Sequence, residues 1–411
     1  MHILEIPSFF PPYGGAFCID QSKALAAMGN TVRIVACVNI SARMTPGLYL
    51  KAPLRAYKVE IQGIEVIRKE IRTVPPVRNF SPLIKYNFKR WVDNVEKVVD
   101  KYVAEYGRPD IIHAHCCKWA GYAAMLVGRK YGVPYVITEH LPFGILCSEL
   151  GKPEDNPWQA EFMREAYHDA ALVIPVAEEE VDDIAPYFGT DYKWKMVSNT
   201  IDTSFFAYRQ RQPLNGRQFV FCCVADFIPR KGYDVLFEAV KRFRKELNGI
   251  YGDKWNGIKL VIAGRDTDSE EMKAMLKQNG LADCTEVCGG VDKYKVREIL
   301  YSSDCFVLAT RSEVQPLVLL EAMSTGIPVV STEAIPRCER IEGACFISKT
   351  DDAVDFARQM RKVYDSTDIC GKKISESIAA MASPAVVGNI LNGLFDGVCK
   401  SFAGNKHLAE Q

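Results

Sequence analysis

Short apolar runs alternate with longer stretches of helical periodicity along almost the whole chain. The runs form two series, residues 2–6, 32–37, 110–114, 134–138 and 172–176 in the first half and 219–225, 258–264, 304–309 and 327–331 in the second. Apolar runs of this length, separated by helical patterns, are typical of parallel strands wound with helices. The pattern therefore predicts an α/β fold with two Rossmann-like, doubly wound sheets.

A polar stretch separates the two series. Residues 208–218, YRQRQPLNGRQ, contain Pro213 and Gly216 as breakers and indicate a linker. A chain of 411 residues also exceeds what one hydrophobic core usually supports. We expect an amino-terminal domain, a carboxy-terminal domain and a last helix that packs back on the first domain, over residues 1–205, 206–384 and 385–402. Since sites in such sheets lie at the carboxyl ends of strands, the natural site is the cleft between two facing domains.

Composition removes several classes of function. The 51 basic and 51 acidic residues cancel, which takes away the electrostatic case for nucleic-acid binding. No apolar run reaches the roughly 18 residues of a spanning helix, and the start MHILEIPSFF lacks the basic segment of a signal peptide. We therefore expect a cytoplasmic protein. The 14 cysteines include no Cys-x-x-Cys pair, and most lie in apolar runs, so we expect core residues and no metal site.

The segment RSEVQPLVLLEAMSTGIPVV, residues 311–330, carries two carboxylates around an apolar helix. Pro316 suits the first helical position and Gly326 the stop, which predicts a helix over 316–325. The free amides of Leu317 and Val318 then form an anion site. Glu313 before the helix and Glu321 within it would repel a bare anion, so we expect them to accept hydrogen bonds from hydroxyls attached to it. That chemistry describes a sugar nucleotide; the alternative is a buried helix with one glutamate at each end.

Other chemically active residues also fall at the predicted carboxyl ends of strands. Arg230 and Lys231 precede a helix that begins near Tyr233, where their charges can neutralise a leaving diphosphate. Gly15 opens the first helix, where a missing side chain lets a ligand approach the backbone. Each feature alone is also typical of an ordinary strand-to-helix turn.

Three histidines and a glutamate follow strands of the first half. His113 and His115 suggest a metal pair by residue type, but residues two apart at a strand end are expected to face opposite ways, and no third ligand is spaced nearby. His140 closes a buried strand directly after Glu139, where it can bind a ligand or merely cap carbonyls.

Residues 71–91 combine basic and aromatic side chains without an acidic residue. This composition favours contact with a membrane surface. The alternative is an ordinary core-facing stripe, because Phe88 begins a helical spacing of apolar residues that continues to Tyr102.

Taken together, these motifs resemble family 4 glycosyltransferases of the GT-B fold. The resemblance rests on Glu-x7-Glu with AMSTGIPVV, on PRKG, VSNTIDTSFF and DIIHAH, and on the amino-terminal Gly-Gly, and it covers roughly residues 1–395. It implies a retaining, metal-independent enzyme that needs no cofactor and takes a nucleoside diphosphate sugar as donor. The first domain would then be the acceptor side and the second the nucleotide-sugar side.

The resemblance also implies roles for single residues. Glu321 matches the glutamate on the ribose hydroxyls and Glu313 the one beside the donor sugar, while Lys231 matches the lysine on the diphosphate. His140 matches the histidine near the donor sugar. Further candidates on the donor side are Arg230, Gly15, Gly264, Gln315, Leu317 and Val318, and on the acceptor side His115 and Glu139.

Two positions depart from the family pattern. Ala225-Asp226 stands where many members have Gly-Arg, so an arginine on the diphosphate is missing and Arg230 is the expected substitute. Gln315-Pro316 stands where many have Phe-Gly, which exchanges a backbone donor for an amide side chain. The identity of the donor sugar stays open.

The function implied is transfer of a hexosyl unit to a hydroxyl of a glycan or lipid-linked glycan, in polysaccharide or glycolipid assembly. The alternatives are a nucleotide-sugar epimerase or a sugar phosphorylase of the same fold, and a catalytically silent sugar-nucleotide-binding subunit.

Overall fold

The chain forms two compact units in the computed structural model. The structure describes residues 1–411 except 12–13, 44, 74–80, 141–156, 253–256 and 410–411. Met1–Thr200 and Pro384–Gln411 make the first unit, and Ile201–Ser383 make the second. The first division thus falls five residues before the expected boundary at 205/206.

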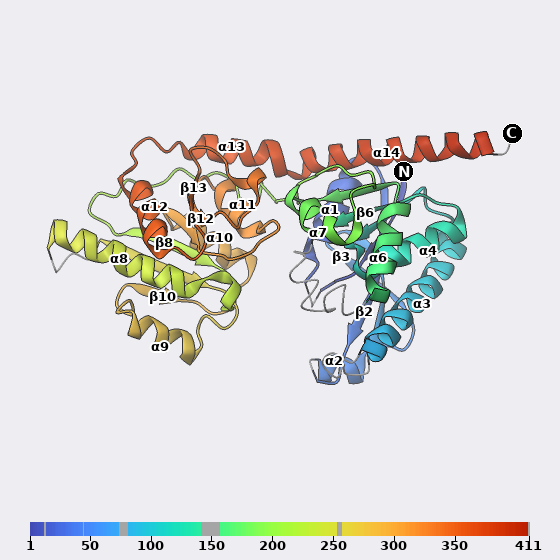
Figure 1. Ribbon diagram of the computed structural model, residues 1–411, viewed down its shortest axis with the longest axis horizontal. Helices are drawn as coiled ribbons and strands as arrows, with labels where there is room; N and C mark the ends of the chain where they lie inside the picture. Colours follow the sequence, from blue (N-terminus) through green and yellow to red (C-terminus); the bar gives the residue numbers. More distant parts are fainter. Residues whose placement is uncertain (12–13, 44, 74–80, 141–156, 253–256, 410–411) are drawn as a thin grey trace. The chain divides into compact units, whose positions relative to one another are not determined.

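A seven-stranded sheet forms the centre of the first unit, in the order β3-β4-β2-β1-β5-β6-β7 (Figure 1). Its strands are β1 (His2–Pro7), β2 (Thr31–Ile40), β3 (Tyr57–Ile61), β4 (Ile64–Arg72), β5 (Ile111–His115), β6 (Tyr135–Glu139) and β7 (Leu172–Pro175). All pairs are parallel except β3 with β4. This hairpin was not predicted; it turns at Gln62-Gly63, where both residues have positive φ, as a two-residue hairpin turn requires.

Helices cover both faces of this sheet. They are α1 (Ala16–Ala27), α2 (Pro46–Lys51), α3 (Ser81–Tyr106), α4 (Tyr122–Tyr131), α6 (Pro157–Asp169), α7 (Glu179–Phe188) and α14 (Pro384–Ala409). On α14, the buried Val387, Leu391 and Phe395 pack in one cluster with Ile3 and Leu25. The carboxy-terminal segment therefore completes the core of the first unit.

Part of this segment also has the composition of a membrane span. The stretch Gly371–Gly404 is long and apolar enough to cross a bilayer by length and composition, with 33% of its most apolar window buried. The amino-acid sequence alone gave no indication of a span here, because polar residues interrupt its apolar stretches. One such helix is weak evidence for a span, because the core helix of a globular protein meets the same test.

The second unit has a fully parallel six-stranded sheet in the order β10-β9-β8-β11-β12-β13. Its strands are β8 (Phe219–Val224), β9 (Ile258–Ala263), β10 (Thr285–Val287), β11 (Cys305–Leu308), β12 (Val329–Thr332) and β13 (Cys345–Ser348). Its helices are α8 (Tyr233–Tyr251), α9 (Glu270–Gln278), α10 (Lys293–Tyr301), α11 (Leu317–Ser324), α12 (Ala353–Asp365) and α13 (Gly371–Ala382). Two doubly wound parallel sheets confirm the predicted fold class.

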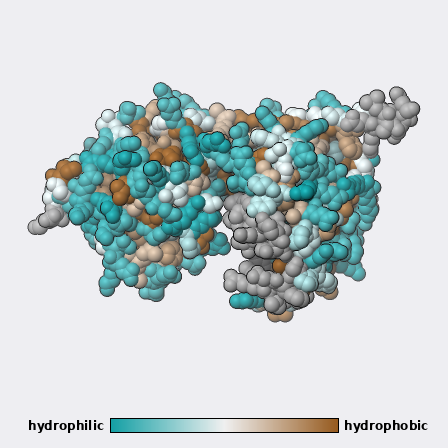
Figure 2. Space-filling model, viewed as in Figure 1, coloured by the Kyte–Doolittle hydropathy of each residue, from teal (hydrophilic) through white to brown (hydrophobic). Residues whose placement is uncertain are grey.

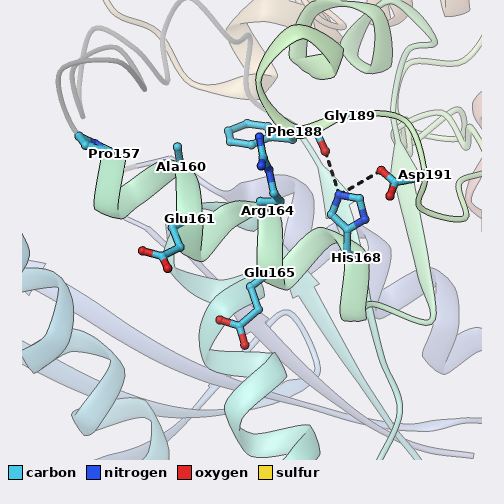
Figure 3. A pocket seen from close by; sticks show the side chains of 9 residues that line it. All are labelled: Pro157, Ala160, Glu161, Arg164, Glu165, His168, Phe188, Gly189 and Asp191. Atoms are coloured by element: carbon cyan, nitrogen blue, oxygen red, sulfur yellow. Dashed lines mark hydrogen bonds and ion pairs between the residues drawn. The ribbon is translucent and has the colours of Figure 1, made fainter.

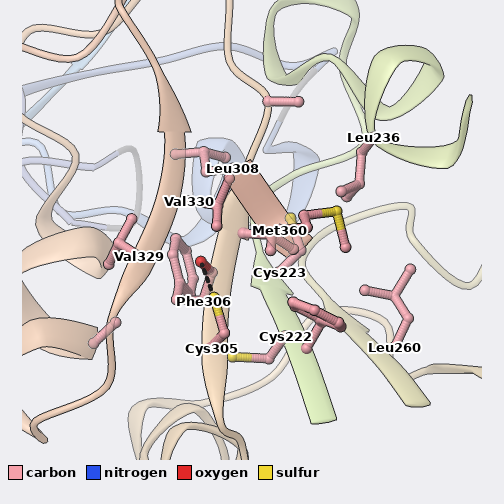
Figure 4. Close-up of a cluster of buried hydrophobic side chains, with 14 of the residues drawn as sticks. Cys222, Cys223, Leu236, Leu260, Cys305, Phe306, Leu308, Val329, Val330 and Met360 are labelled. Carbon is pink, nitrogen blue, oxygen red and sulfur yellow. Dashed lines mark hydrogen bonds between the residues drawn. The ribbon is translucent and has the colours of Figure 1, made fainter. Parts of the chain in front are cut away.

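The core of the second unit contains several of the cysteines (Figure 4). Cys222, Cys223 and Cys305 are fully buried among strand and helix side chains. Burial raises the pKa of the Cys222 and Cys223 thiols to about 12. These cysteines are therefore protonated, small apolar residues. The surface turned to the viewer in Figure 2 is by contrast mostly hydrophilic on both units, with scattered hydrophobic residues.

Candidate functional site

The turn between β8 and α8 carries the two predicted cations. A 3-10 turn, Pro229–Lys231, ends at Gly232 with φ 66°. A Cβ at Gly232 would lie 1.8 Å from the carbonyl oxygen of Ala309, at the end of β11. Only glycine fits this approach, and it brings Arg230 and Lys231 to the carboxyl end of β11.

Glu313 meets both cations there. Lys231 Nζ donates to its Oε1 at 2.5 Å and Arg230 Nη1 to its Oε2 at 2.9 Å, while the Thr310 hydroxyl donates to Oε1 at 2.9 Å. The Glu313 side chain is only 7% exposed. Three residues predicted for the donor site thus form one charge network in the second unit, with two cations held by one carboxylate.

Helix α11 begins directly beyond this network. It spans Leu317–Ser324, and Pro316 lies at the N-cap with extended backbone, so the helix starts one residue later than predicted. The first amides of a helix have no partner within it, which leaves those of Leu317 and Val318 as donors at its open end. Gln315 is buried and Glu321 half-buried, and both have interactions within the protein.

Asp226 follows β8, at a position where many family members have an arginine. It pairs with Arg265, which follows the neighbouring strand β9. Arg265 Nη2 and Nε donate to Asp226 Oδ2 at 2.5 and 3.0 Å, and its backbone N–H donates to Oδ1 at 3.0 Å. Burial would raise the pKa of Asp226, but the Arg265 hydrogen bonds outweigh it and lower the pKa. Gly264 allows this approach, because a Cβ there would lie 2.0 Å from the Ala225 carbonyl oxygen.

Arg265 is therefore a candidate that sequence reasoning missed. Its side chain is 81% exposed, so its charge is available beside the β8 turn. Its position after Gly264, at the end of a predicted strand, was the one feature of the sequence that could have suggested it. Its pairing with Asp226, 39 residues away, could not be predicted from the sequence.

Glu339 is a second group that the sequence did not suggest. It ends a 3-10 turn, Arg337–Glu339, and is fully buried. Neither carboxyl oxygen has a hydrogen-bond partner in the described part of the chain. Burial first, and then the charge of Glu313, raise the pKa of Glu339 well above its usual value, so this position disfavours the charged form of the carboxyl group.

In the first unit, Glu5 on β1 binds two histidines of β5. His115 Nε2 donates to Glu5 Oε2 at 2.7 Å, and His113 Nδ1 lies 2.8 Å from the same oxygen, not aligned for a hydrogen bond. The expectation that the two histidines face opposite ways was wrong, because side chains two apart on a strand point to the same face. Glu5 was not predicted at all.

His140 extends this network toward the end of β6. His115 is neutral, because burial lowers its pKa to about 4. Its one N–H serves Glu5, so its Nδ1 accepts from His140 Nε2 at 3.1 Å. The His140 ring stacks on Phe17 of α1, with the ring centroids 3.8 Å apart. The Glu5 carboxylate thus fixes the tautomer of His115, and His115 in turn fixes that of His140.

The same region contains one group of potential metal ligands. Ligand atoms of Glu5, Cys18 and His115 lie within 4.8 Å of one another, all buried. The chemistry does not favour an ion, because burial raises the pKa of the Cys18 thiol well above its ordinary value and His115 already donates to Glu5. The hydrogen bond from His115 accounts for its contact with Glu5.

Two further predicted residues of the first unit have internal partners. Glu139 is buried and accepts from the Cys117 amide at 2.9 Å and the Tyr167 hydroxyl at 2.8 Å. Gly15 has φ 79°, and a Cβ there would lie 2.1 Å from the Phe9 carbonyl oxygen. Both residues fix the backbone where strands β1 and β6 end.

The basic and aromatic stretch 71–91 lies partly outside the described residues. Of its described aromatic residues, Phe88 and Trp91 are buried in the core of the first unit, as the alternative of a core-facing stripe predicts. Arg90 donates to the carbonyl of Arg72 at 2.6 Å, and Lys85 lies over the Trp158 ring. Among the described residues of this stretch, Phe88, Trp91, Arg90 and Lys85 thus have contacts within the unit, while Tyr86 and Lys89 are exposed.

A wide hollow of about 860 Å³ opens elsewhere on the first unit, between α6 and the end of α7 (Figure 3). His168 occupies its wall, with Nε2 2.9 Å from the carbonyl oxygen of Phe188 and 3.3 Å from Asp191 Oδ1. This histidine joins two elements, and none of the predicted site residues lines the hollow.

Solved structures place the fold among GT-B glycosyltransferases. The chain is similar to sucrose-phosphate synthase from Thermosynechococcus elongatus, with 15% identity, a TM-score of 0.75, and coverage of 98% of this chain and 100% of that one. It is also similar to HepE of Anabaena, solved in complex with UDP, with 16% identity, a TM-score of 0.68, and coverage of 97% and 100%.

Sequence comparison gives the family. The model "Glycosyltransferase Family 4" matches residues 14–205 and "Glycosyl transferases group 1" matches 204–378. The teichuronic acid biosynthesis glycosyltransferase TuaC of Bacillus subtilis is 26% identical over 81% of each chain. The colanic acid biosynthesis glycosyltransferase WcaL of Salmonella typhimurium is 23% identical over 85% of this chain and 87% of its own. The chain belongs to the group 1, family 4 glycosyltransferases.

Proposed function

We propose that this glycosyltransferase moves a hexosyl unit from a nucleoside diphosphate sugar to a hydroxyl acceptor, with retention at the anomeric carbon. The observation that carries the proposal is the network of Glu313 with Arg230 and Lys231, beside the open end of α11. Two cations and free helix amides suit a diphosphate, and a carboxylate suits sugar hydroxyls.

The proposed chemistry depends on charge at the leaving group. The bond between the anomeric carbon and the diphosphate oxygen breaks, a bond to the acceptor oxygen forms, and the hydroxyl proton passes to the departing diphosphate. Lys231, Arg230 and the amides of Leu317 and Val318 stabilise the negative charge that builds up. We propose that these groups need no assistance from a metal ion.

Donor binding is assigned to the second unit. Glu321 would bind the ribose hydroxyls, Glu313 and Gln315 the transferred sugar, and Arg265 the phosphates together with Lys231. HepE of Anabaena was solved with UDP and starch synthase IV of Arabidopsis thaliana with ADP, which supports a nucleoside diphosphate and leaves the base open.

The acceptor is assigned to the first unit. His140 would contact the transferred sugar or the acceptor hydroxyl, and His115 and Glu139 support that edge of the sheet. A glycan or lipid-linked glycan is the proposed acceptor, since relatives named for teichuronic acid, colanic acid and phosphatidylinositol are among those found. In the described part of the chain all 13 cysteines are free thiols, which suits the cytoplasmic face of a membrane.

A catalytically silent subunit that binds the sugar nucleotide is the second candidate. It is favoured by the departures at Asp226 and Pro316, which change two phosphate and sugar contacts of the family.

Ligand-induced stabilisation tests donor binding, and donor hydrolysis separates the two candidates. A nucleotide at roughly 100 times its dissociation constant adds about 2.7 kcal/mol to the free energy of unfolding. Thermal melts with UDP, GDP, ADP and CMP should show a shift with one diphosphate; no shift with any of them contradicts the donor site. If a donor binds but prolonged incubation releases neither sugar nor product, the chain is the silent subunit.

A further inference from the structure

Two leucines on one short segment of the first unit are exposed to an unusual degree. Leu50, on α2, is 81% exposed and Leu54, just after it, 78%. They are the most exposed large hydrophobic side chains of the described residues. Neighbouring residues of the same segment, Leu48 and Tyr49, pack instead on a core cluster of the unit. The segment is therefore anchored on one side and presents leucines on the other.

The backbone of this segment is held firmly. Arg72, at the end of β4, donates to the carbonyls of Tyr49 and Ala52 at 2.9 and 2.7 Å, and Arg90 of α3 donates to the carbonyl of Arg72. Lys69 donates to the carbonyl of Leu54. These contacts tie α2 to the beginning of α3, where Figure 1 shows it at the lower end of the unit. Burial of these two leucines against an apolar partner would be favourable. Because the segment is held in place, both side chains are presented together to such a partner.

The charge of the segment is of one sign. Residues 41–59 contain Arg43, Lys51, Arg55 and Lys58 and no acidic residue, although the whole chain is balanced. Lys58 pairs with Glu105. The other three are exposed, and none of them has an ion-pair partner in the part of the chain that the structure describes. Unpaired cations around exposed leucines complement an anionic lipid surface.

We propose that the described residues of the segment 41–55 dock on an anionic bilayer, with Leu50 and Leu54 inserted between the headgroups and Arg43, Lys51 and Arg55 on their phosphates. In the stretch 71–91, which the sequence suggested for membrane contact, Phe88 and Trp91 face the core whereas Tyr86 is exposed. A second copy of the chain fits less well, because a twofold contact through this segment brings like charges together. The inference rests on the proposed lipid-linked acceptor for its purpose, since docking brings the first unit to that acceptor.

Co-sedimentation of the full chain with vesicles tests the proposal. We compare phosphatidylcholine vesicles with vesicles that also contain phosphatidylglycerol, at low and high salt. The parent should pellet with the anionic vesicles at low salt. Arg43→Ser/Lys51→Ser/Arg55→Ser should lower the apparent affinity by roughly 100-fold, and Leu50→Ser/Leu54→Ser by at least about tenfold.

Matched variants of the second unit supply the controls. Ile250→Ser/Val354→Ser removes hydrophobic side chains that are 56% and 61% exposed, and Lys245→Ser/Lys277→Ser/Lys373→Ser removes three exposed cations; both should pellet like the parent. Equal pelleting of the leucine variant and the parent overturns the proposal, as does a loss shared by the controls. A dimer in sedimentation velocity that disappears in Leu50→Ser/Leu54→Ser also overturns it. Nucleotide-induced thermal shifts are measured without vesicles and report donor binding alone. A failure of membrane docking can therefore be distinguished from a failure of the proposed function.

Discussion

At the scale of single residues, Glu313 binds two cations that the proposed function assigns to the diphosphate. Glu313→Gln removes the charge that neutralises Lys231 and Arg230. We expect UDP, or whichever diphosphate binds, to be held as tightly as by the parent or more tightly, because both cations are released. Sugar transfer should fall by roughly 10² to 10³, the usual effect of losing one preorganised contact in the transition state. Calorimetry and steady-state rates measure the two effects.

The exposed Glu342 gives a control for this variant. Glu342→Gln should leave both binding and turnover unchanged. Should Glu313→Gln behave like Glu342→Gln, the carboxylate is only a structural counter-ion of the turn.

Asp226 and Arg265 form a pair whose role a mutant cycle can test. Arg265→Ala removes a cation from the β9 end, and Asp226→Ala leaves that cation without the carboxylate that orients it. Each should weaken diphosphate binding by up to about tenfold, near 1.4 kcal/mol. The double variant should be no weaker than Arg265→Ala, because both act through the same guanidinium. Fully additive losses, measured by titration calorimetry, show that Asp226 acts independently.

Residue types were easier to predict than residue contacts. Glu313, Lys231 and Arg230 were predicted from their places at strand ends, and the structure joins them in one network. Glu5 was missed because a carboxylate inside an apolar strand has no local signature. Arg265 was missed because its partner Asp226 lies 39 residues away, and Glu339 because the burial of a residue in a 3-10 turn depends on tertiary packing. The facing of His113 and His115 was mistaken although strand periodicity alone decides it.

At the scale of elements, β1 and β5 share the buried network of Glu5 and His115, which makes the stability of the fold depend on pH. Burial lowers the pKa of His115 from an ordinary value of 6.5 to about 4. For Glu5, burial alone would raise the pKa, but the nearby His113 and the hydrogen bond from His115 lower it from 4.5 to about 2. The unfolded chain therefore binds more protons than the folded one in both ranges, and stability falls as the pH falls.

We expect the free energy of unfolding to decrease from pH 6.5 to 4 through His115, and from 4.5 to 2 through Glu5. Urea titrations at several pH values measure it. Glu5→Gln should be less stable at pH 7 by about 1–3 kcal/mol, since the buried His115 exchanges a charged acceptor for a weaker neutral one, and its stability should depend less on pH below 4.5. A parent curve that is flat from pH 7 to 4 contradicts this account.

Helix α14 meets α1 at a glycine, and two glycines of the same helix permit a matched comparison. A Cβ at Gly388 would lie 2.7 Å from the carbonyl oxygen of Ala24, whereas one at Gly393 meets nothing within 4 Å. Gly388→Ala should destabilise the first unit by about 1–3 kcal/mol through overpacking. Gly393→Ala should be neutral or stabilise by up to about 1 kcal/mol, because alanine favours the helix. Thermal or urea unfolding distinguishes them; equal effects would show that the helices do not pack closely.

Central elements were predicted better than edge elements. All nine predicted apolar runs coincide with strands, because buried parallel strands have continuous apolar sequences. Four strands were missed, the edge strands β3, β10 and β13 and the inner strand β4. β3 alternates half-buried and exposed residues, β10 and β13 have three and four residues, and β4 carries Arg68, Lys69 and Glu70 in its middle. Strands with one open edge need fewer apolar residues, so their sequences resemble loops.

At the scale of the whole molecule, the balance of charge hides two local concentrations of cations. One lies at the candidate donor site, where Arg230, Lys231 and Arg265 come from two strand ends, and the other on the segment 41–55. The net charge of the chain does not reveal either group of cations, because it sums the charges of the whole surface. The fold assembles the donor-site group through pairings that lie up to 83 positions apart, whereas the cations of the segment 41–55 are neighbours in the sequence.

The cations of the donor site lead to a prediction about metal dependence. If Lys231, Arg230 and the α11 amides supply the charge that stabilises the departing diphosphate, turnover should survive EDTA with less than about a twofold change. Lys231→Ala should lower the rate by roughly 10² to 10³. It should also weaken the binding of nucleoside diphosphates more than that of monophosphates, because the Lys231 ammonium is assigned to the additional phosphate charge. Added Mg²⁺ or Mn²⁺ should leave the rate of the parent unchanged. The control is a transfer assay in which EDTA is neutralised by excess Mg²⁺. Loss of activity on chelation, restored by either ion, would mean that a metal performs the step assigned here to the side chains.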